Sequence, residues 1–246
     1  MLEYSVIIPA YDEEVLLADT IGSLHKGMEE MPKIAGEIIV VDNNSSDRTA
    51  SVARSAGAHV VFEPVNQISR ARNSGAREAR GECFLFVDAD TQVPPRLLAQ
   101  ALTAMKAEKV GAGGSTLHFD SDVPQGVSSA QLIERWNCIS RTFRLAAGSF
   151  LFCLREAFES VGGFSEKVFA GEEIFLSIAL KGWCRRNDRD FRILDKFPVV
   201  TSSRKLAWYS KRRLYAVILL PCLCPFLLRS KRFCRFWYER PESSSG

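Results

Sequence analysis

The sequence contains few of the residues that bind metals through nitrogen or sulfur. It has three histidines, and its seven cysteines include no CxxC pair and leave one residue over if they are paired. We therefore expect neither a disulfide framework nor a zinc site, and the cysteine usage indicates a reduced, cytoplasmic chain. With 246 residues, the chain can bury a sizeable core without such cross-links.

The sequence also lacks a hydrophobic run that could cross a membrane as a helix. The run Leu214–Leu228 has fifteen uncharged residues, whereas a spanning helix needs about 20, and Pro221 and Pro225 interrupt it. The start of the chain is apolar for only a few residues, without a basic segment before them, so no secretory signal is expected. "GAGGS" at 111–115 lacks the lysine of a phosphate-binding loop.

The net charge of +3 conceals an uneven distribution. Residues 204–240 contain ten Lys or Arg and one acidic residue, a net charge of +9, so the rest of the chain carries −6. Such a tail favours an anionic partner, such as nucleic acid, phospholipid or a phosphorylated substrate. No nucleic-acid-binding module accompanies it, and we expect no nucleic-acid partner.

The tail at 206–246 has two interpretations. Basic residues stand on both sides of its apolar run, at 211–213 and 229–232, and aromatic residues follow. This pattern is typical of a segment that lies in the interface of an anionic membrane, which would place the protein at the inner face of the cell membrane. The alternative is a C-terminal helix that is broken at the prolines and docked on the body of the protein, and it needs no partner.

Short β-branched runs alternate with helical patterns through the first 110 residues. Strands are predicted at 4–11, 37–43, 59–64 and 83–90, and helices at 13–29, 47–57, 68–81 and 94–108. Because parallel strands need helical crossovers, this alternation predicts an α/β fold. We expect a Rossmann-like, mainly parallel central sheet with helices on both faces.

Acidic residues follow three of these strands, in "PAYDEE", "VDNNSSD" and "VDAD". In open α/β sheets, ligands bind beyond the carboxyl ends of the strands. Asp88 and Asp90, in an extended segment, would point to the same side. Their hard oxygens would suit Mg²⁺ or Mn²⁺ that in turn holds a diphosphate. The alternative is a surface turn, because Asp favours turns.

Four motifs, in this order, resemble the nucleotide-binding half of a family 2 glycosyltransferase with the GT-A fold. They are "VIIPAYDEE" (6–14), "IIVVDNNSSDRT" (38–49), "ARNSGAREARGE" (71–82) and "FLFVDADT" (84–91). The resemblance continues more weakly through 148–166 and 171–183 and does not cover the tail. It implies a GT-A domain at 1–205, with a nucleotide-sugar-binding half at 1–110 and an acceptor half at 111–205.

The resemblance also implies an activity. A family 2 enzyme with the DxD motif would be a metal-dependent, inverting transferase, with Mn²⁺ or Mg²⁺ as cofactor. It would move a sugar from a nucleotide diphosphate sugar of UDP or GDP type to a hydroxyl acceptor that the sequence does not identify. The alternatives are a non-catalytic nucleotide-sugar-binding protein and a sugar nucleotidyltransferase. The second usually has a Gly-rich basic loop after its first strand, where this chain has "PAYDEE".

The family's binding roles transfer onto individual positions. The residues expected to bind the nucleotide sugar are Pro9, Tyr11, Glu13, Asp42, Arg72, Asp88 and Asp90. The resemblance assigns Asp42 to the base and Arg72 to the pyrophosphate. It places Asp88 nearer the ribose and makes Asp90 the direct metal ligand. Many relatives have Asn at the position of Asp12, and either side chain could cap the following helix.

The acceptor half supplies the expected base. Glu172 and Glu173 match the acidic pair of the family, and Glu173 is the predicted catalytic base that takes the acceptor proton. The alternative is that both glutamates only complement the dipole of a helix starting there. In that helix Ile174, Ile178 and Phe175 are expected to face inward. Arg204, after the last predicted strand, is a weaker candidate for contact with the diphosphate.

Overall fold

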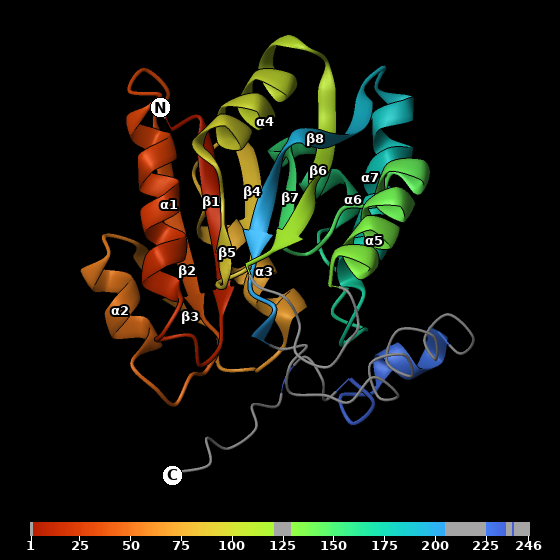
Figure 1. Cartoon of the computed structure of the whole chain (residues 1–246). Coiled ribbons are helices and arrows are strands. Elements are labelled where there is room, and N and C mark those ends of the chain that lie inside the picture. Colours follow the sequence, from red (N-terminus) through yellow and green to blue (C-terminus); the bar gives the residue numbers. More distant parts are fainter. Residues whose placement is uncertain (1, 121–128, 205–224, 235–237, 239–246) are drawn as a thin grey trace.

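The computed structural model describes residues 2–120, 129–204, 225–234 and 238. It has a central eight-stranded sheet with the strand order β3-β2-β1-β4-β7-β6-β8-β5. Helices cover both faces of the sheet, as predicted (Figure 1). The described end of the chain lies below the carboxyl ends of the first strands.

The first half consists of regular strand–helix units. Its parallel strands are β1 (Tyr4–Ala10), β2 (Gly36–Asp42), β3 (His59–Phe62) and β4 (Cys83–Val87). Its helices are α1 (Leu17–Glu29), α2 (Thr49–Ser55), α3 (Ile68–Glu78) and α4 (Pro95–Ala107). All eight predicted elements are present, and α4 has proline at its first turn, as its sequence indicated.

The second half adds antiparallel strands. It contains β6 (Val110–Phe119), β7 (Phe150–Leu154) and β8 (Asp190–Thr201), and β8 also pairs with the short β5 (Thr91–Gln92), which lies between β4 and α4 in the sequence. The strand β7 lies between β4 and β6 and is antiparallel to both, and β5 is antiparallel to β8. Only the β6–β8 pair is parallel here. The sheet is therefore parallel in the first half and mixed in the second.

The core has two layers, one on each face of the sheet. Alternation along β1 sends Val6 and Ile8 to one layer and Ile7 to the other. The first layer packs against α1, α2, α4 and α5 (Ser129–Phe143), and the second against α3, α6 (Arg155–Val161) and α7 (Glu172–Arg186). The "GAGGS" segment is part of buried β6, which confirms that it is no phosphate loop.

The predicted orientation of α7 is wrong. The helix buries Leu176, Leu180 and Trp183, whereas Phe175 is 42% exposed and Ile178 55% exposed. The apolar residues of α7 are distributed around its whole circumference, so hydrophobic periodicity does not indicate which side faces the core. The burial of Glu172 in a charged cluster fixes the rotation instead.

The described part of the tail packs against the body of the protein. A short 3₁₀ helix, η1 (Pro225–Arg229), is linked to the body by a 2.6 Å hydrogen bond from Phe169 N to Leu228 O. Cys234 and Tyr238 are buried beside Ala170. This supports the docked interpretation for residues 225–234 and 238. Most of the apolar run, at 214–224, lies outside the described residues, so the membrane interpretation stays a prediction.

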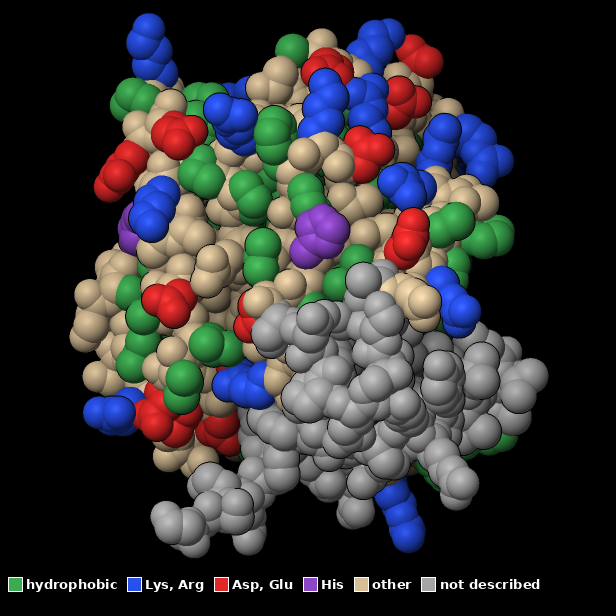
Figure 2. All heavy atoms as spheres, viewed as in Figure 1, with side chains coloured by type: hydrophobic (Ala, Val, Ile, Leu, Met, Phe, Trp, Pro, Cys, Tyr) green, Lys and Arg blue, Asp and Glu red, His purple; other side chains and the backbone are tan. Residues whose placement is uncertain are grey.

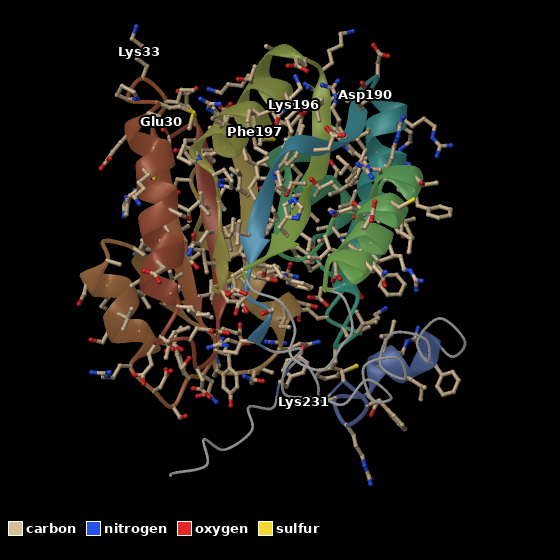
Figure 3. All side chains as sticks on the ribbon, viewed as in Figure 1. Glu30, Lys33, Asp190, Lys196, Phe197 and Lys231 are labelled. Carbon is tan, nitrogen blue, oxygen red and sulfur yellow. The ribbon has the colours of Figure 1, made fainter. Side chains whose placement is uncertain are left out.

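The charged tail and the opposite end of the sheet are far apart. Figure 3 shows Lys231 beyond the carboxyl ends of the first strands, whereas Lys33, Asp190 and Lys196 lie at the other end of the molecule.

Within the described ranges, no helix combines the length and the apolar character that a membrane crossing requires.

Candidate active site

The acidic pair after β4 lies in a turn. The strand ends at Val87, and Thr91 N donates a 3.1 Å hydrogen bond to Asp88 O, which closes the turn. The expected extended conformation at 88–90 is therefore wrong, whereas the shared direction of the two carboxylates stays a prediction. The turn and the binding site are not alternatives, because the turn places Asp88 beside the buried charged cluster described next.

Arg72 is the centre of this cluster. Its guanidinium donates to Glu172 Oε1 at 2.7 Å, to Asp88 Oδ1 at 2.9 Å and to Gly148 O at 3.2 Å. Only 3% of the residue is exposed, and its guanidinium carbon lies 5.1 Å from the centre of the Phe164 ring. A buried charge is tolerated only when it is paired and hydrogen-bonded, and two carboxylates satisfy that requirement here.

Small residues bring α3 close enough to the sheet to place Arg72 at the strand ends. Gly75 allows this approach, because a Cβ atom there would lie 2.5 Å from the side chain of Ile7. Ala71 and Ala76 are buried in the same layer. The predicted contact between Arg72 and a pyrophosphate stays a prediction, whereas the structure gives Arg72 a role in joining β4 to α7.

Gly148 keeps space open beside the carboxylate of Asp88. A Cβ atom at this position would lie 2.9 Å from Arg72 Nη2 and 3.6 Å from Asp88 Oδ2. Arg72 occupies the other oxygen of Asp88, and Oδ2 accepts no hydrogen bond from the described residues. The donors fit a hard divalent cation, because Asp88 keeps one carboxylate oxygen outside its ion pair with Arg72 and the buried Asp90 supplies a second carboxylate nearby.

Protein groups alone would not complete such a metal site. Among the described residues, no group of three or more His, Cys, Asp or Glu side chains is arranged to hold a metal ion. A cation at Asp88 and Asp90 would take its remaining ligands from water and from the substrate, as Mg²⁺ commonly does.

The two glutamates at the start of α7 have different surroundings. Glu172 is 3% exposed and bonded to Arg72, and burial raises its pKa even though Arg72 opposes the shift. Burial and the neighbouring Glu172 raise the pKa of Glu173 to about 8. Both residues therefore lie at the same charged site as Asp88, and Glu173 is the one without an ion-pair partner among the described residues.

The carboxylates after β1 and β2 hold their loops together. Asp12 Oδ1 accepts a 2.7 Å hydrogen bond from Ser46 N, so the predicted capping of α1 by Asp12 is wrong. Asp42 Oδ1 accepts from Ser45 N at 3.0 Å. Asp47 binds the backbone N–H of Thr49, in the first turn of α2, at 2.9 Å.

The remaining nucleotide-site candidates lie along the same loop edge. Pro9 is in β1, Tyr11 follows it and is partly buried, and Glu13 is 3% exposed. Glu13 accepts a 2.5 Å hydrogen bond from Arg204, which follows β8. Arg204 therefore reaches the site edge, where it contacts a carboxylate. Its contact with a diphosphate remains a prediction.

Three structural residues of the site were not predicted from the sequence. Asn43 donates to Glu63 O and Val65 O and accepts from Gln67 N, which fixes the loop before α3. Gly148 and Phe164 contact Arg72. Both belong to the segment 148–166 in which the family resemblance is weak, and that resemblance was the only available signal.

Comparison with known proteins identifies the family. The family model described as "Glycosyl transferase family 2" matches residues 5–162. The poly(ribitol-phosphate) β-N-acetylglucosaminyltransferase TarS of Staphylococcus aureus is 31% identical over 108 residues, which cover 41% of this chain and 18% of TarS. A dolichol-phosphate mannosyltransferase of Pyrococcus furiosus is 27% identical over 203 residues, covering 74% of this chain and 53% of the relative.

Solved structures show the same fold. A mannosyltransferase of Pyrobaculum calidifontis, in complex with GDP-Man and Mn²⁺, matches with a TM-score of 0.67 and 20% identity, covering 95% of this chain and 64% of its own. TarS residues 1–349 match with a TM-score of 0.63 and 21% identity, covering 95% and 73%. The chain spans less than two thirds of the length of TarS and the Pyrococcus enzyme. The predicted GT-A fold is confirmed.

Proposed function

Because the chain belongs to glycosyl transferase family 2 and is a glycosyltransferase, we propose that it performs a single inverting displacement. A sugar would move from a nucleotide diphosphate sugar, of UDP or GDP type, to a hydroxyl acceptor. Solved neighbours bound to GDP-Man or to UDP support this donor class. Membership of this family favours sugar transfer over nucleotidyl transfer.

The observation that carries the proposal is the bridge made by Arg72. It links Asp88, at the end of β4, with Glu172, at the start of α7, through hydrogen bonds of 2.9 and 2.7 Å. Donor-binding acids and acceptor-side acids, 84 positions apart in the sequence, therefore share one site. A displacement reaction requires this proximity of leaving group and attacking hydroxyl.

We assign the general base to Glu173. Its oxygens are not held by Arg72, and its raised pKa, about 8, is matched to proton transfer near neutral pH. Glu172 holds Arg72 and so orients Asp88. A base must be ionised to accept a proton, so the proposed rate increases with pH until Glu173 has lost its proton.

We propose Asp90 and Asp88 as ligands of a divalent cation, Mn²⁺ or Mg²⁺. When bound, such an ion stabilises the negative charge that develops on the leaving diphosphate. Three solved neighbours contain Mn²⁺, which supports a divalent cofactor. We propose that the reaction takes place in the cytoplasm, and the five described cysteines, all of them free, are consistent with that setting.

A thermal-shift screen tests the donor and the metal together. Ligands that bind the folded state raise its melting temperature. UDP, GDP, ADP and CDP should be compared with and without Mn²⁺. One of them should raise the melting temperature more with Mn²⁺ than the sum of the separate effects, and Asp90→Asn should remove that excess. Equal shifts for all four nucleotides, independent of metal and of Asp90, would contradict the proposal.

The stereochemistry needs a second experiment. With the donor identified by the screen, proton NMR of the first released sugar, or of the transfer product, gives the anomeric configuration. A product with the configuration opposite to that of the donor supports the single displacement. Retention of configuration would overturn it without affecting the donor assignment.

A further inference from the structure

The helices α5 and α7 expose large apolar side chains away from the core. Phe143 on α5 is 62% exposed and Ile178 on α7 is 55% exposed. Ile139, one turn before Phe143, is 44% exposed, and Phe175, one turn before Ile178, is 42% exposed. We call these four side chains the α5/α7 face. An exposed apolar group of this kind commonly marks an interaction surface.

The two helices meet where this face lies. Lys181 Nζ, on α7, donates a 2.8 Å hydrogen bond to the carbonyl oxygen of Phe143, at the end of α5. Ile178 is one helical turn before Lys181, so it lies beside the same junction. A second bond, of 3.1 Å, from Ala146 N to Ser177 Oγ holds the following loop against α7. Figure 2 shows hydrophobic side chains together with Lys and Arg over α5, at the right edge.

The surroundings of this face are basic. Segments 129–144 and 174–189 contain Arg135, Arg141, Arg144, Lys181, Arg185, Arg186 and Arg189 against Glu134 and Asp188, and the two glutamates at the start of α7 belong to the candidate active site. Arg141 and Arg185 are exposed and have no ion-pair partner among the described residues. Since the whole chain has a net charge of only +3, this surface concentrates positive charge beside apolar side chains.

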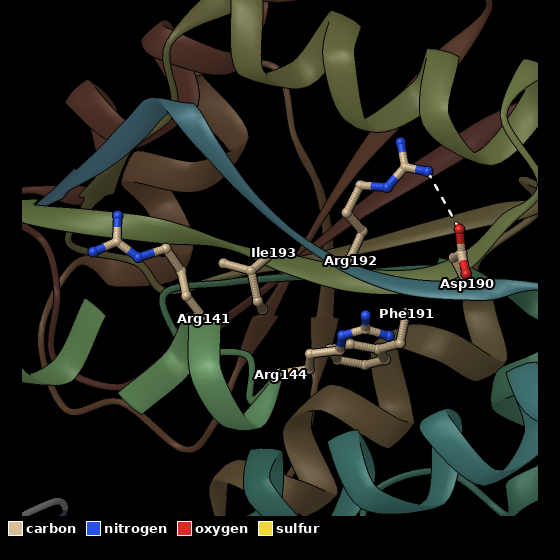
Figure 4. A pocket seen from close by; sticks show the side chains of 6 residues that line it. All are labelled: Arg141, Arg144, Asp190, Phe191, Arg192 and Ile193. Carbon is tan, nitrogen blue, oxygen red and sulfur yellow. Dashed lines mark hydrogen bonds and ion pairs between the residues drawn. The ribbon is translucent and has the colours of Figure 1, made fainter. Parts of the chain in front are cut away.

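A shallow cavity of about 210 Å³ lies next to the end of α5. It is lined by Arg141, Arg144, Asp190, Phe191, Arg192 and Ile193. Figure 4 shows that the guanidinium groups of Arg141 and Arg192 point in different directions, and that Arg192 turns toward Asp190. Because the arginines do not converge on one point, this arrangement suits many separate anionic groups better than a single bound ion.

The described tail continues the surface past the start of α7. Leu228 of η1 packs near Gly171, with its Cδ1 atom 3.8 Å from where a Cβ of residue 171 would stand. Phe226 is 68% exposed and Phe233 57% exposed. Basic residues separate them, at 229, 231 and 232.

We propose that the α5/α7 face docks on an anionic lipid bilayer. Phe143 and Ile178 enter the boundary between headgroups and acyl chains, and the surrounding arginines meet headgroup phosphates. The combination of exposed apolar side chains and a rim in which basic residues outnumber acidic ones favours a bilayer over a protein partner of mixed charge. The proposal does not depend on residues 214–224, and it does not rest on the proposed reaction.

The test is sedimentation of the full chain with vesicles. The chain should bind vesicles of phosphatidylcholine that contain a minority of phosphatidylglycerol, and it should bind pure phosphatidylcholine far less. Replacing Phe143 and Ile178 together by Ser should lower the partition coefficient by about tenfold or more, because both apolar side chains leave the interface. Arg141→Gln with Arg185→Gln should lower it roughly fivefold per charge at low salt, since each basic residue near the surface contributes about 1 kcal/mol.

Matched control variants lie at the far edge of the sheet. Phe62 is 61% exposed on β3, and Arg54 is exposed on α2. Phe62→Ser and Arg54→Gln should leave vesicle binding unchanged. Excess inorganic phosphate should compete only weakly, because the bilayer supplies apolar burial as well as phosphate groups. If excess phosphate lowered vesicle binding of the wild type as much as the two arginine substitutions do, the apolar side chains would have no role in docking.

Three further results would contradict the proposal. Equal binding of the wild type and of the Phe143/Ile178 variant shows that another surface docks. A large fall in melting temperature for that variant shows that the chain itself covers the face. A wild-type dimer that the variant turns into a monomer identifies the face as an interface between copies. Nucleotide-dependent thermal shifts of the variant should stay as in the wild type, which separates this proposal from the proposed function.

Discussion

Two groups of carboxylates in this molecule have different hydrogen-bond partners. One group follows β1 and β2, and the other surrounds Arg72. Asp12 and Asp42 accept hydrogen bonds from backbone N–H groups of the same or a neighbouring loop. Asp88 and Glu172 share one buried guanidinium. The first group holds loops in shape, whereas the second couples two segments of the chain that are remote in sequence.

This difference predicts which substitutions will have only a local effect on the structure. A carboxylate bonded to backbone N–H groups can often be replaced by an amide, because the amide oxygen still accepts. A carboxylate that balances a buried charge cannot be neutralised without leaving that charge unpaired.

Asp90→Asn should abolish sugar transfer and the metal-dependent part of nucleotide binding. An amide is a poor ligand for a hard divalent cation compared with a carboxylate. The measurements are transfer in saturating Mn²⁺ and the thermal shift with the preferred nucleotide. Asp12→Asn is the matched control and should retain activity. Transfer at the wild-type rate in Asp90→Asn would show that the metal ligand lies elsewhere.

Glu173→Gln should lower kcat by roughly 10²–10⁴-fold, the usual effect of losing a general base. Donor binding should be nearly unchanged, because Gln has the same shape. Kinetics with saturating donor and a separate measurement of the donor dissociation constant check this. If Glu172→Gln shows the large loss of kcat and also removes the pH dependence of kcat, the roles of the two glutamates must be exchanged.

Arg72→Met should lower the free energy of unfolding by about 3–5 kcal/mol, because it leaves buried carboxylates unpaired. Combining it with Glu172→Leu should restore part of that loss, since the second change removes the unpaired charge. Lys109→Met is the control. It breaks an exposed pair with Asp188, which should contribute at most about 1 kcal/mol. Denaturant unfolding of all variants measures the contrast.

The pH dependence of stability should report on Glu173. Its pKa rises from 4.5 to about 8 in the folded protein, so between these values the folded state keeps a proton that the unfolded state releases. The contribution of Glu173 to stability is therefore complete below pH 4.5 and falls as the pH rises to about 8.

Glu173→Gln removes this contribution at every pH. The melting temperature of the variant should therefore increase relative to the wild type as the pH rises through that window. Glu159→Gln, an exposed change on α6, should show a constant difference from the wild type. A constant difference for Glu173→Gln would show that the carboxyl group titrates normally.

Asp12→Asn should change the free energy of unfolding by less than about 0.5 kcal/mol. The amide oxygen can still accept from Ser46 N, and Asn tolerates the positive φ of 49° at this position. A loss above about 1 kcal/mol would mean that the negative charge of Asp12 stabilises the loop.

The sequence predicts the first half well because its signals are local. Each strand from β1 to β4 is a short apolar run, and each following helix has its own periodicity and end signals. The order of β7, β6 and β8 depends on contacts between distant segments, which no local pattern encodes. The motifs predict which acids form the candidate site, and the structure places two of them, Asp88 and Glu172, on the same guanidinium.

The spatial arrangement of the site residues was not predictable from the sequence. Nothing local in the sequence says that Arg72 reaches Glu172, 100 positions away, or that Gly148 makes room for this contact. The orientation of α7 was mispredicted for the same reason, since Glu172 is buried by its ionic partner and not by hydrophobic periodicity.

The position of β7 has a consequence for how the chain folds. The apolar strand β4 pairs with β1 on one side, and its other edge is filled only by residues 150–154. A fragment ending near residue 110 would therefore leave the open edge "CFLFV" available for pairing with other chains. During synthesis, this edge stays unsatisfied until the ribosome has made a further segment of chain. We therefore expect an N-terminal fragment to be insoluble. We also expect the whole chain to fold slowly, because long loops must close before these non-local strands can pair.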